Sequence, residues 1–323
     1  MKRNCFVLIL FILANSAAAF AQVTSLPETR NATLRYWQAF AEIKDPPADK
    51  STLDLMEKTL AGQAAWNEAK LAAVLDPNQM ALGIFLRATS LPECDWGLEY
   101  RRGPDASIAI VPRASVIARL NSLQAMREMA NRHNDAAVDR WIAGLRFSQD
   151  LAHNGSLIFA LTAKSTLMAN FRALSAAIKD GRFNDSQKKR LYAAVRKLPD
   201  DGFDWAATWG LEEAGAEVFF QQLRESKNPS ALYESMTGEA PSPDCMPPGK
   251  KQQNDFREYM FSVQAALREP PPTAKSRLET LEASRNKLCS EAQNTIPSPQ
   301  RINEARAEIS VARQSLLLAL TPK

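Results

Sequence analysis

Apolar positions recur at helical spacing along almost the whole chain. Apolar residues return three and four positions apart, and hardly any segment alternates apolar and polar residues over the length that a strand needs. Glycine is sparse, with 12 in 323 residues. We therefore expect an all-α protein. The pattern predicts helices over residues 29–43, 51–61, 63–75, 78–89, 112–131, 135–152, 156–179, 185–198, 203–225, 252–268, 273–293 and 300–320.

Two of the predicted turns share the dipeptide His-Asn, at residues 133–134 and 153–154. Asparagine accepts the left-handed backbone conformation that closes a helix, and a histidine in the last turn can interact with the exposed carbonyl groups. We therefore interpret His133 and His153 as helix-end residues rather than catalytic ones.

The last predicted helix has a narrow apolar stripe. A seam of this width is typical of packing against one neighbouring helix. The preceding helix is the simplest partner, which would make a C-terminal helical hairpin, and a second protein chain is the alternative. The stripe consists of Ile302, Ala305, Ile309, Ala312, Leu316 and Ala319.

A proline-rich stretch interrupts the helical pattern late in the chain, with prolines at positions 241, 243, 247 and 248. Proline is a strong breaker of regular structure, so we place a boundary there. The predicted organisation is a signal peptide over 1–21, a helical superhelix over 22–238, a proline-rich linker over 239–251 and a C-terminal helical segment over 252–323.

The first residues have the order of a secretory signal peptide. The basic pair Lys2-Arg3 precedes an apolar run over 6–13 and the small-residue segment 17–21, which predicts cleavage after Ala21. The apolar run is short for a membrane span, and no second long apolar segment follows. We expect an exported protein, either periplasmic or secreted, with no transmembrane segment after cleavage.

Charge and cysteine content narrow the possible partners. Without residues 1–21 the net charge falls from +4 to about +2, which gives no electrostatic reason to expect nucleic acid. An oxidising compartment favours disulfides, and Cys94, Cys245 and Cys289 remain after cleavage. We favour a bridge between Cys245 and Cys289, which would tether the proline-rich loop. Pairing of Cys94 with either of the other two is the alternative.

Residues 112–152 resemble one tetratricopeptide unit. Ala137, Trp141 and Gly144 reproduce the order of small, aromatic and small residues in the second helix of that repeat, where two helices pack closely. No second copy appears at a fixed period, so we expect an irregular α-solenoid rather than a regular array.

A wider resemblance covers residues 30–200. The order of CDWG, Gly-Pro, a helix and then AVDRWIAGLRFSQDL resembles an uncharacterised family of exported bacterial α-helical proteins. The resemblance implies an α-superhelical fold and supplies no activity and no catalytic residue.

Motifs of metal, nucleophile and phosphate chemistry are absent from the sequence, which contains no HExxH, CxxC or GxSxG. With only two histidines, the chain is poorly supplied for proton transfer or metal ligation. We expect no metal and no cofactor, and we favour a binding protein over an enzyme.

The stretch PECDWGLEYRRGPD, residues 92–105, is the first candidate site. Its aromatic, glycine and polar residues suit a structural plug between helical layers, with Asp95 capping backbone amides. The alternative is a binding lip at the mouth of a groove. Its binding candidates are Trp96, Tyr100, Arg101 and Arg102, to which we add Trp141.

Residues 200–223 are the second candidate site, because carboxylates and aromatic residues are interleaved there. Glu213 and Glu217 share a helix face, and Trp205 and Trp209 do so one or two turns earlier. Paired carboxylates beside indole rings suit a sugar-binding or sugar-cleaving groove. A buried core helix with a solvated acidic face is the alternative interpretation.

Three functional hypotheses follow. The leading one is an exported non-enzymatic scaffold that binds a protein or peptide of the cell envelope. The second is a glycan-binding or glycan-cleaving protein that uses residues 200–220. The third is an envelope protein that self-associates through the C-terminal apolar seam, and the sequence does not fix the oligomeric state.

Overall fold

The computed structural model describes residues 29–46, 49–99, 110–242, 249–288, 293 and 296–321. Over these residues the protein is all-α, as predicted, and one isolated β-bridge joins Asn31 to Glu93. None of the helices in these ranges has both the length and the apolar character needed to cross a bilayer. The α-helices are α2 (Ala32–Glu42), α3 (Lys50–Leu60), α4 (Glu68–Leu75), α5 (Gln79–Ala88), α6 (Ile110–Ala130), α7 (Asn134–Ala152), α8 (Leu157–Lys179), α9 (Asp185–Arg196), α10 (Trp205–Glu225), α11 (Pro229–Thr237), α12 (Lys250–Leu267), α13 (Pro271–Ser284) and α15 (Pro299–Leu320).

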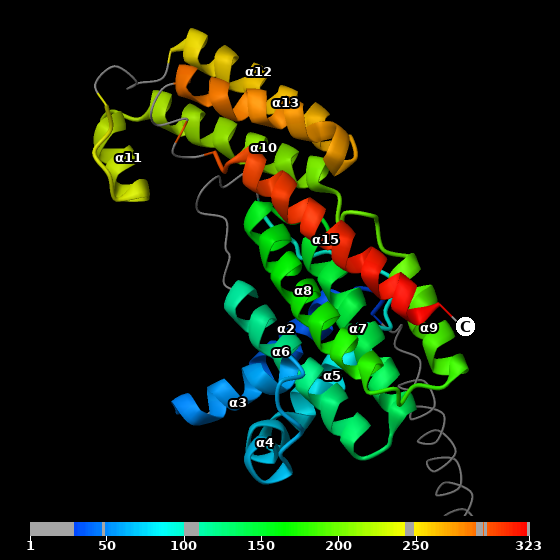
Figure 1. The fold of residues 1–323 in the computed structure, drawn as a ribbon. Helices are drawn as coiled ribbons and strands as arrows, with labels where there is room; N and C mark the ends of the chain where they lie inside the picture. The colour runs from blue at the N-terminus through cyan, green and yellow to red at the C-terminus, as the bar shows by residue number, and fades with distance from the viewer. Residues whose placement is uncertain are drawn as a thin grey trace, which may run out of the picture.

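The molecule is elongated (Figure 1). Helices α2 to α9 gather at one end, α10, α12 and α13 lie toward the other, and α15 runs along both. Helices α6, α7 and α8 pack on one another, α2 packs on α5 and α6, and α10 packs on α8 and α12. The hydrophobic core is continuous through these contacts.

Helices α7 and α8 cross closely at Gly144. A Cβ atom at Gly144 would lie 2.6 Å from Asn170 Nδ2, so a larger residue would displace the Asn170 side chain or force the helices apart. Asn170 donates a hydrogen bond to the Trp141 carbonyl oxygen at 3.1 Å, and Ala137 and Trp141 are fully buried. Gly144 thus marks a close crossing of α7 with α8, whereas the tetratricopeptide resemblance over residues 112–152 placed the crossing between α7 and α6.

The two histidines lie at the ends of α7, as predicted. His133 precedes the helix and His153 follows it. Asn154 takes the left-handed conformation after α7 with φ of 51°, whereas in the turn before α7 Arg132 takes it, with φ of 65°.

Several predicted boundaries are wrong. The helix expected over 63–75 begins only at Glu68, because the Asn67 side chain caps it by accepting a hydrogen bond from the Lys70 amide at 3.2 Å. Residues 61–66 therefore form an irregular connection. Helix α11 was not predicted, although Asn228 caps it and Pro229 occupies its first position. Helix α13 begins at Pro271 rather than after the prolines, since proline is tolerated in a first turn.

The prediction that α15 packs on a single helix is also wrong. It packs on α13, as expected for the hairpin, but also on α8 and α9. Two arginines of α15 are buried in these contacts, Arg306 at 1% exposure and Arg313 at 8%. The sequence pattern counted only apolar residues, so it missed the second contact surface.

Both arginines bind the segment that joins α9 to α10. Arg306 Nε donates to Asp201 Oδ2 at 2.8 Å. Arg313 donates through Nη1 to Asp200 Oδ1 at 2.7 Å, and through Nε and Nη2 to the carbonyl oxygens of Val195 and Arg196 at 3.2 and 3.0 Å. The carbonyls at the end of a helix lack partners within it, so Arg313 also caps α9.

Gly202 allows α15 to approach this segment. Its φ is +91°, and a Cβ atom there would lie 2.9 Å from Ile309 Cδ1. A side chain at this position would be strained in the backbone and would also collide with α15.

Replacing Arg306 with alanine is expected to destabilise the protein by about 3 kcal/mol, because Asp201 and the Glu269 carbonyl then lose a buried charged donor. Thermal unfolding should show a fall of roughly 6 °C or more in Tm. Arg301→Ala, at an exposed position of the same helix, should change the stability by less than about 0.5 kcal/mol. Equal effects of the two substitutions would contradict the assigned role of Arg306.

Candidate functional site

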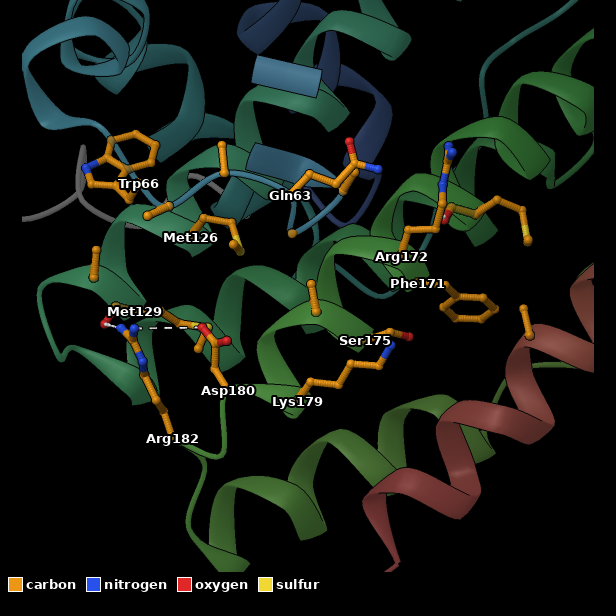
Figure 2. Close-up of a pocket in the computed structure, with 18 of the residues that line it drawn as sticks. Gln63, Trp66, Met126, Met129, Phe171, Arg172, Ser175, Lys179, Asp180 and Arg182 are labelled. Carbon is orange, nitrogen blue, oxygen red and sulfur yellow. Dashed lines mark hydrogen bonds and ion pairs between the residues drawn. The ribbon is translucent and has the colours of Figure 1, made fainter. Parts of the chain in front are cut away.

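A cavity of about 980 Å³ lies between the C-terminal halves of α6 and α8 (Figure 2). The connection between α3 and α4, residues 61–66, and the C-terminal half of α15 complete its walls. We call this cavity the α8 groove. Its volume is at the upper end of the usual range for ligand pockets in proteins.

One face of α8 forms the long wall of the groove. The lining residues are spaced by three, one, three, one and three positions, which places them in a single stripe along three turns. Helix α6 adds Met126, Met129 and Ala130, and α15 adds Ala312 and Ser315. The α8 stripe consists of Met168, Phe171, Arg172, Ser175, Ala176 and Lys179.

The apolar part of the groove combines flexible methionine side chains with two aromatic rings. Met126, Met168 and Trp66 are half-buried at the surface of the groove, and Phe171 is buried beneath it. Trp66 Nε1 donates a hydrogen bond to Glu68 Oε2 at 2.7 Å, which holds the indole in place. Methionine is flexible and polarisable, and it is typical of surfaces that accept partners of varied shape.

The charged part of the groove is positive. Arg172 and Lys179 are exposed and make no ion pair with any described residue. Arg182 Nη2 forms an ion pair with Asp180 Oδ2 at 3.7 Å (Figure 2). Arg182 Nη1 also donates a hydrogen bond to the Met129 carbonyl oxygen at 3.2 Å. With three cations and one carboxylate in its lining, the groove favours an anionic ligand.

Gly62 brings the α3–α4 connection directly onto α8. Its φ is +70°, and a Cβ atom there would lie 2.5 Å from Ala176 Cβ. A second cavity of about 200 Å³ lies beside the end of α3, against α6 and α8, and Arg172 and Ala61 line both cavities. The Glu57–Arg119 ion pair, at 3.0 Å, lies in the lining of the second cavity.

A buried polar cluster centres on Asp150 of α7, outside the groove. Tyr36 donates its hydroxyl hydrogen to Asp150 Oδ2 at 2.7 Å, and Arg146 Nε lies 2.8 Å from Asp150 Oδ1. Trp96 Nε1 donates to the Asp150 backbone oxygen at 2.7 Å. The cluster thereby ties α2 and residues 92–97 to α7.

Burial raises the pKa values of three groups in and beside this cluster, Asp150, Tyr36 and Cys94. Desolvation raises the pKa of Asp150, against the opposing hydrogen bond from Tyr36 and the charge of Arg146. Desolvation and the neighbouring Asp150 raise the pKa of Tyr36 well above its usual value. Burial also raises the pKa of Cys94 to about 12, so its thiol stays protonated and is a poor nucleophile. These groups are suited to holding structure together.

The first candidate stretch is partly described. Trp96 is 6% exposed and stacks on Tyr36 and Phe40 at centroid distances of 5.5 and 6.2 Å. Asp95 Oδ1 accepts a hydrogen bond from the Gly97 amide at 2.9 Å, which is the expected backbone cap. The ring of Trp96 thus fills a space between α2 and α7. Tyr100, Arg101 and Arg102 lie outside the described residues.

Two further predictions concern residues away from the groove. Trp141 is fully buried, so its ring faces no open surface. Cys245 and Cys289 lie outside the described residues. Cys94 is free and buried, and its sulfur lies 3.4 Å from Thr33 Oγ1.

In the second candidate stretch the tryptophans belong to the core. Trp205 is 2% exposed and donates to the Asp201 carbonyl oxygen at 2.9 Å, and Trp209 is 0% exposed and donates to the Met260 carbonyl oxygen at 3.0 Å. Both rings are buried between packed helices, so neither has an exposed face on which a sugar could stack.

The two carboxylates lie together on α10. The pKa of Glu213 is raised by partial burial and by the charge of Glu217. Glu217 is paired with Arg257 of α12 and lines a cavity of about 220 Å³ between α10 and α12. The structure therefore brings together the two glutamates, but it separates them from accessible indole rings.

The sequence pattern did not single out the groove residues. Residues 156–179 were expected to form one long apolar helix, and Arg172, Ser175 and Lys179 were not distinguished within it. The sequence spacing could have indicated them. Ser175 and Lys179 follow Arg172 by three and seven positions, which places these polar residues in the same helical stripe as Met168 and Phe171.

Comparisons with known proteins give no identification: no family model, curated protein or solved structure matches the chain. In the part of the chain that the structure describes, no three histidine, cysteine, aspartate or glutamate side chains are grouped as metal ligands.

Cys94 is expected to resist maleimide labelling in the folded protein. With a pKa of about 12, only about one thiol in ten thousand is ionised at pH 8, and burial also blocks access. In a Cys245→Ser, Cys289→Ser variant of residues 22–323, mass spectrometry should detect labelling only after urea unfolding. Complete labelling within minutes under native conditions would contradict the described burial.

Asp150→Asn is expected to change how stability depends on pH. The folded-state pKa of Asp150 is raised, so its contribution to stability is fully present below the unfolded pKa near 4 and declines as pH rises through the folded value. Urea titrations from pH 4 to pH 8 should show the unfolding free energy of the natural protein falling relative to that of the variant. A pH-independent difference, or one of opposite sign, would refute the raised pKa.

Proposed function

We propose that the protein is an exported, non-enzymatic helical scaffold that holds a segment of another envelope protein in the α8 groove. The groove is the observation on which this proposal rests. It has a volume of about 980 Å³, and its lining includes half-buried methionine and tryptophan side chains and cations without ion-pair partners among the described residues. Binding sites of this kind combine an apolar floor with a few polar groups that fix orientation.

The helix arrangement supports a scaffold. Helices α6, α7 and α8 pack on one another, α9 packs on α7, and α15 packs along α8 and α9, and the body as a whole is elongated (Figure 1). We interpret this body as an irregular α-solenoid related in its helix packing to tetratricopeptide units. In such proteins, stacked helices create long concave surfaces that bind peptides.

The distribution of titratable groups also supports binding rather than catalysis. The buried side chains of Tyr36 and Asp150 are hydrogen-bonded to each other, and the buried Cys94 contacts Thr33. None of these residues lines the groove. Within the groove lining, the single carboxylate, Asp180, lies beside Arg182. The signal-peptide pattern of residues 1–21 supports export to the periplasm or the medium.

A photo-crosslinking amino acid at Ser175, in the middle of the α8 stripe, should capture a protein partner in intact cells of the source organism. The same amino acid at Lys189, on the exposed side of α9, is the matched control. Adducts at Ser175 should be lost when Ser315→Trp fills the groove and retained with Glu304→Trp, an exposed position elsewhere on α15.

Identical adducts from Ser175 and Lys189, or adducts at Ser175 that survive Ser315→Trp, would contradict binding in the groove. If Ser175 yielded no adduct while Lys189 yielded one, the binding surface would lie elsewhere on the molecule. Circular dichroism of each variant shows whether Ser315→Trp has merely unfolded the protein.

A further inference from the structure

We infer that the occupant of the α8 groove is an acidic amphipathic α-helix of another protein chain, an inference that rests on the proposed function. The shape of the groove is the first observation. The α8 stripe runs from Met168 to Lys179, which lie eleven positions or about 17 Å apart along the helix axis. This length accommodates about three turns of a partner helix.

Three helix faces converge on the groove. Besides α8, helix α6 presents Met126 with Met129 and Ala130, which follow it by three and four positions, and α15 presents Ala312 and Ser315, three positions apart. Rows of side chains at this spacing are the surfaces into which another helix packs. The α8 groove thus has the form of a place for one additional helix.

Small side chains set how closely a helix can approach. Ser175 of α8, Ala130 of α6, and Ala312 and Ser315 of α15 lie in the walls, between the larger methionines and Phe171. Packed helices lie about 8–10 Å apart, and small residues at the contact favour the shorter separations. The methionines offer sockets for leucine, methionine or phenylalanine side chains of the occupant.

Charge selects an acidic helix. Arg172 and Lys179 are seven residues apart on α8, two helical turns or about 10.5 Å, and neither is paired among the described residues. A partner helix with carboxylates two turns apart would match both. Arg172 can bind one carboxylate through two parallel hydrogen bonds, and Lys179 can bind the other as a point charge.

The distribution of polar groups favours a peptide over a single-chain lipid. An acyl chain requires a continuous apolar lining with the charged group at one end. In the groove, Arg172 and Lys179 are two turns apart with Ser175 between them, and Gln63 and Ser315 also line the wall. Polar groups spread along the length suit an amphipathic helix.

The test uses a displayed library of peptides of about 16 residues, with leucines fixed at positions i, i+3, i+4 and i+7 and with Glu, Gln or Lys at the flanking positions. Selection on residues 22–323 should enrich glutamates at two positions seven residues apart. Fluorescence anisotropy should then show binding of a selected peptide weakened at least about tenfold by Arg172→Glu, Lys179→Glu.

Two controls make the result specific. Lys189→Glu removes an exposed cation outside the groove and should leave the affinity unchanged. Replacing the selected glutamates with lysines should restore binding to the charge-reversed variant. Enrichment of lysine, absence of any charge preference, or equal weakening by Lys189→Glu would overturn the inference.

The two proposals fail in different ways. If the Ser175 crosslinker captures a partner whose crosslinked segment is basic or non-helical, the groove is a binding site but not one for an acidic helix. If acidic helical peptides bind through Arg172 and Lys179 but cells give no adduct at Ser175, the chemistry of the groove is as inferred and the scaffold function is contradicted.

Discussion

The position of α15 depends on two arginine side chains buried against the segment between α9 and α10. A guanidinium group removed from water is costly unless charged and hydrogen-bonding partners surround it. Arg306 has Asp201 and the Glu269 carbonyl oxygen, and Arg313 has Asp200 and two carbonyls at the end of α9. These directional contacts fix the rotation of α15 about its axis, which an apolar seam alone would leave less defined.

The α8 groove follows from that rotation. With Arg306 and Arg313 turned toward residues 195–201, the same helix turns Ala312 and Ser315 toward α8 and α6. Those small residues leave space where larger ones would close the wall. At the other side, Gly62 lets the α3–α4 connection rest on Ala176 and bound the groove. The groove therefore exists because the α3–α4 connection packs closely on α8 at one edge and because small side chains line its walls.

The fold class and most helices could be predicted from the chain, because helical periodicity depends on local spacing. Capping residues such as Asn67 and Asn228 were visible in the sequence, yet local pattern alone did not show which asparagines begin a helix. The buried arginines of α15 could not be predicted, since their carboxylate partners, Asp201 and Asp200, lie more than 100 positions away in the sequence. Four of the proposed site residues proved to be core residues: Trp96, Trp141, Trp205 and Trp209. Burying a large aromatic side chain removes much apolar surface from water, which stabilises the fold. The groove combines residues from four parts of the chain, so no single motif indicates it.

The central claim is that the α8 groove binds an acidic helix, and methyl NMR of the methionines tests it most directly. Residues 22–323 labelled at the methionine methyl groups would be titrated with a synthetic acidic amphipathic helical peptide. The account predicts that the signals of Met126 and Met168 shift in a saturable way, while those of Met236 on α11 and Met260 on α12 stay in place. Shifts confined to Met236 and Met260, or no shift at any methionine, would contradict it.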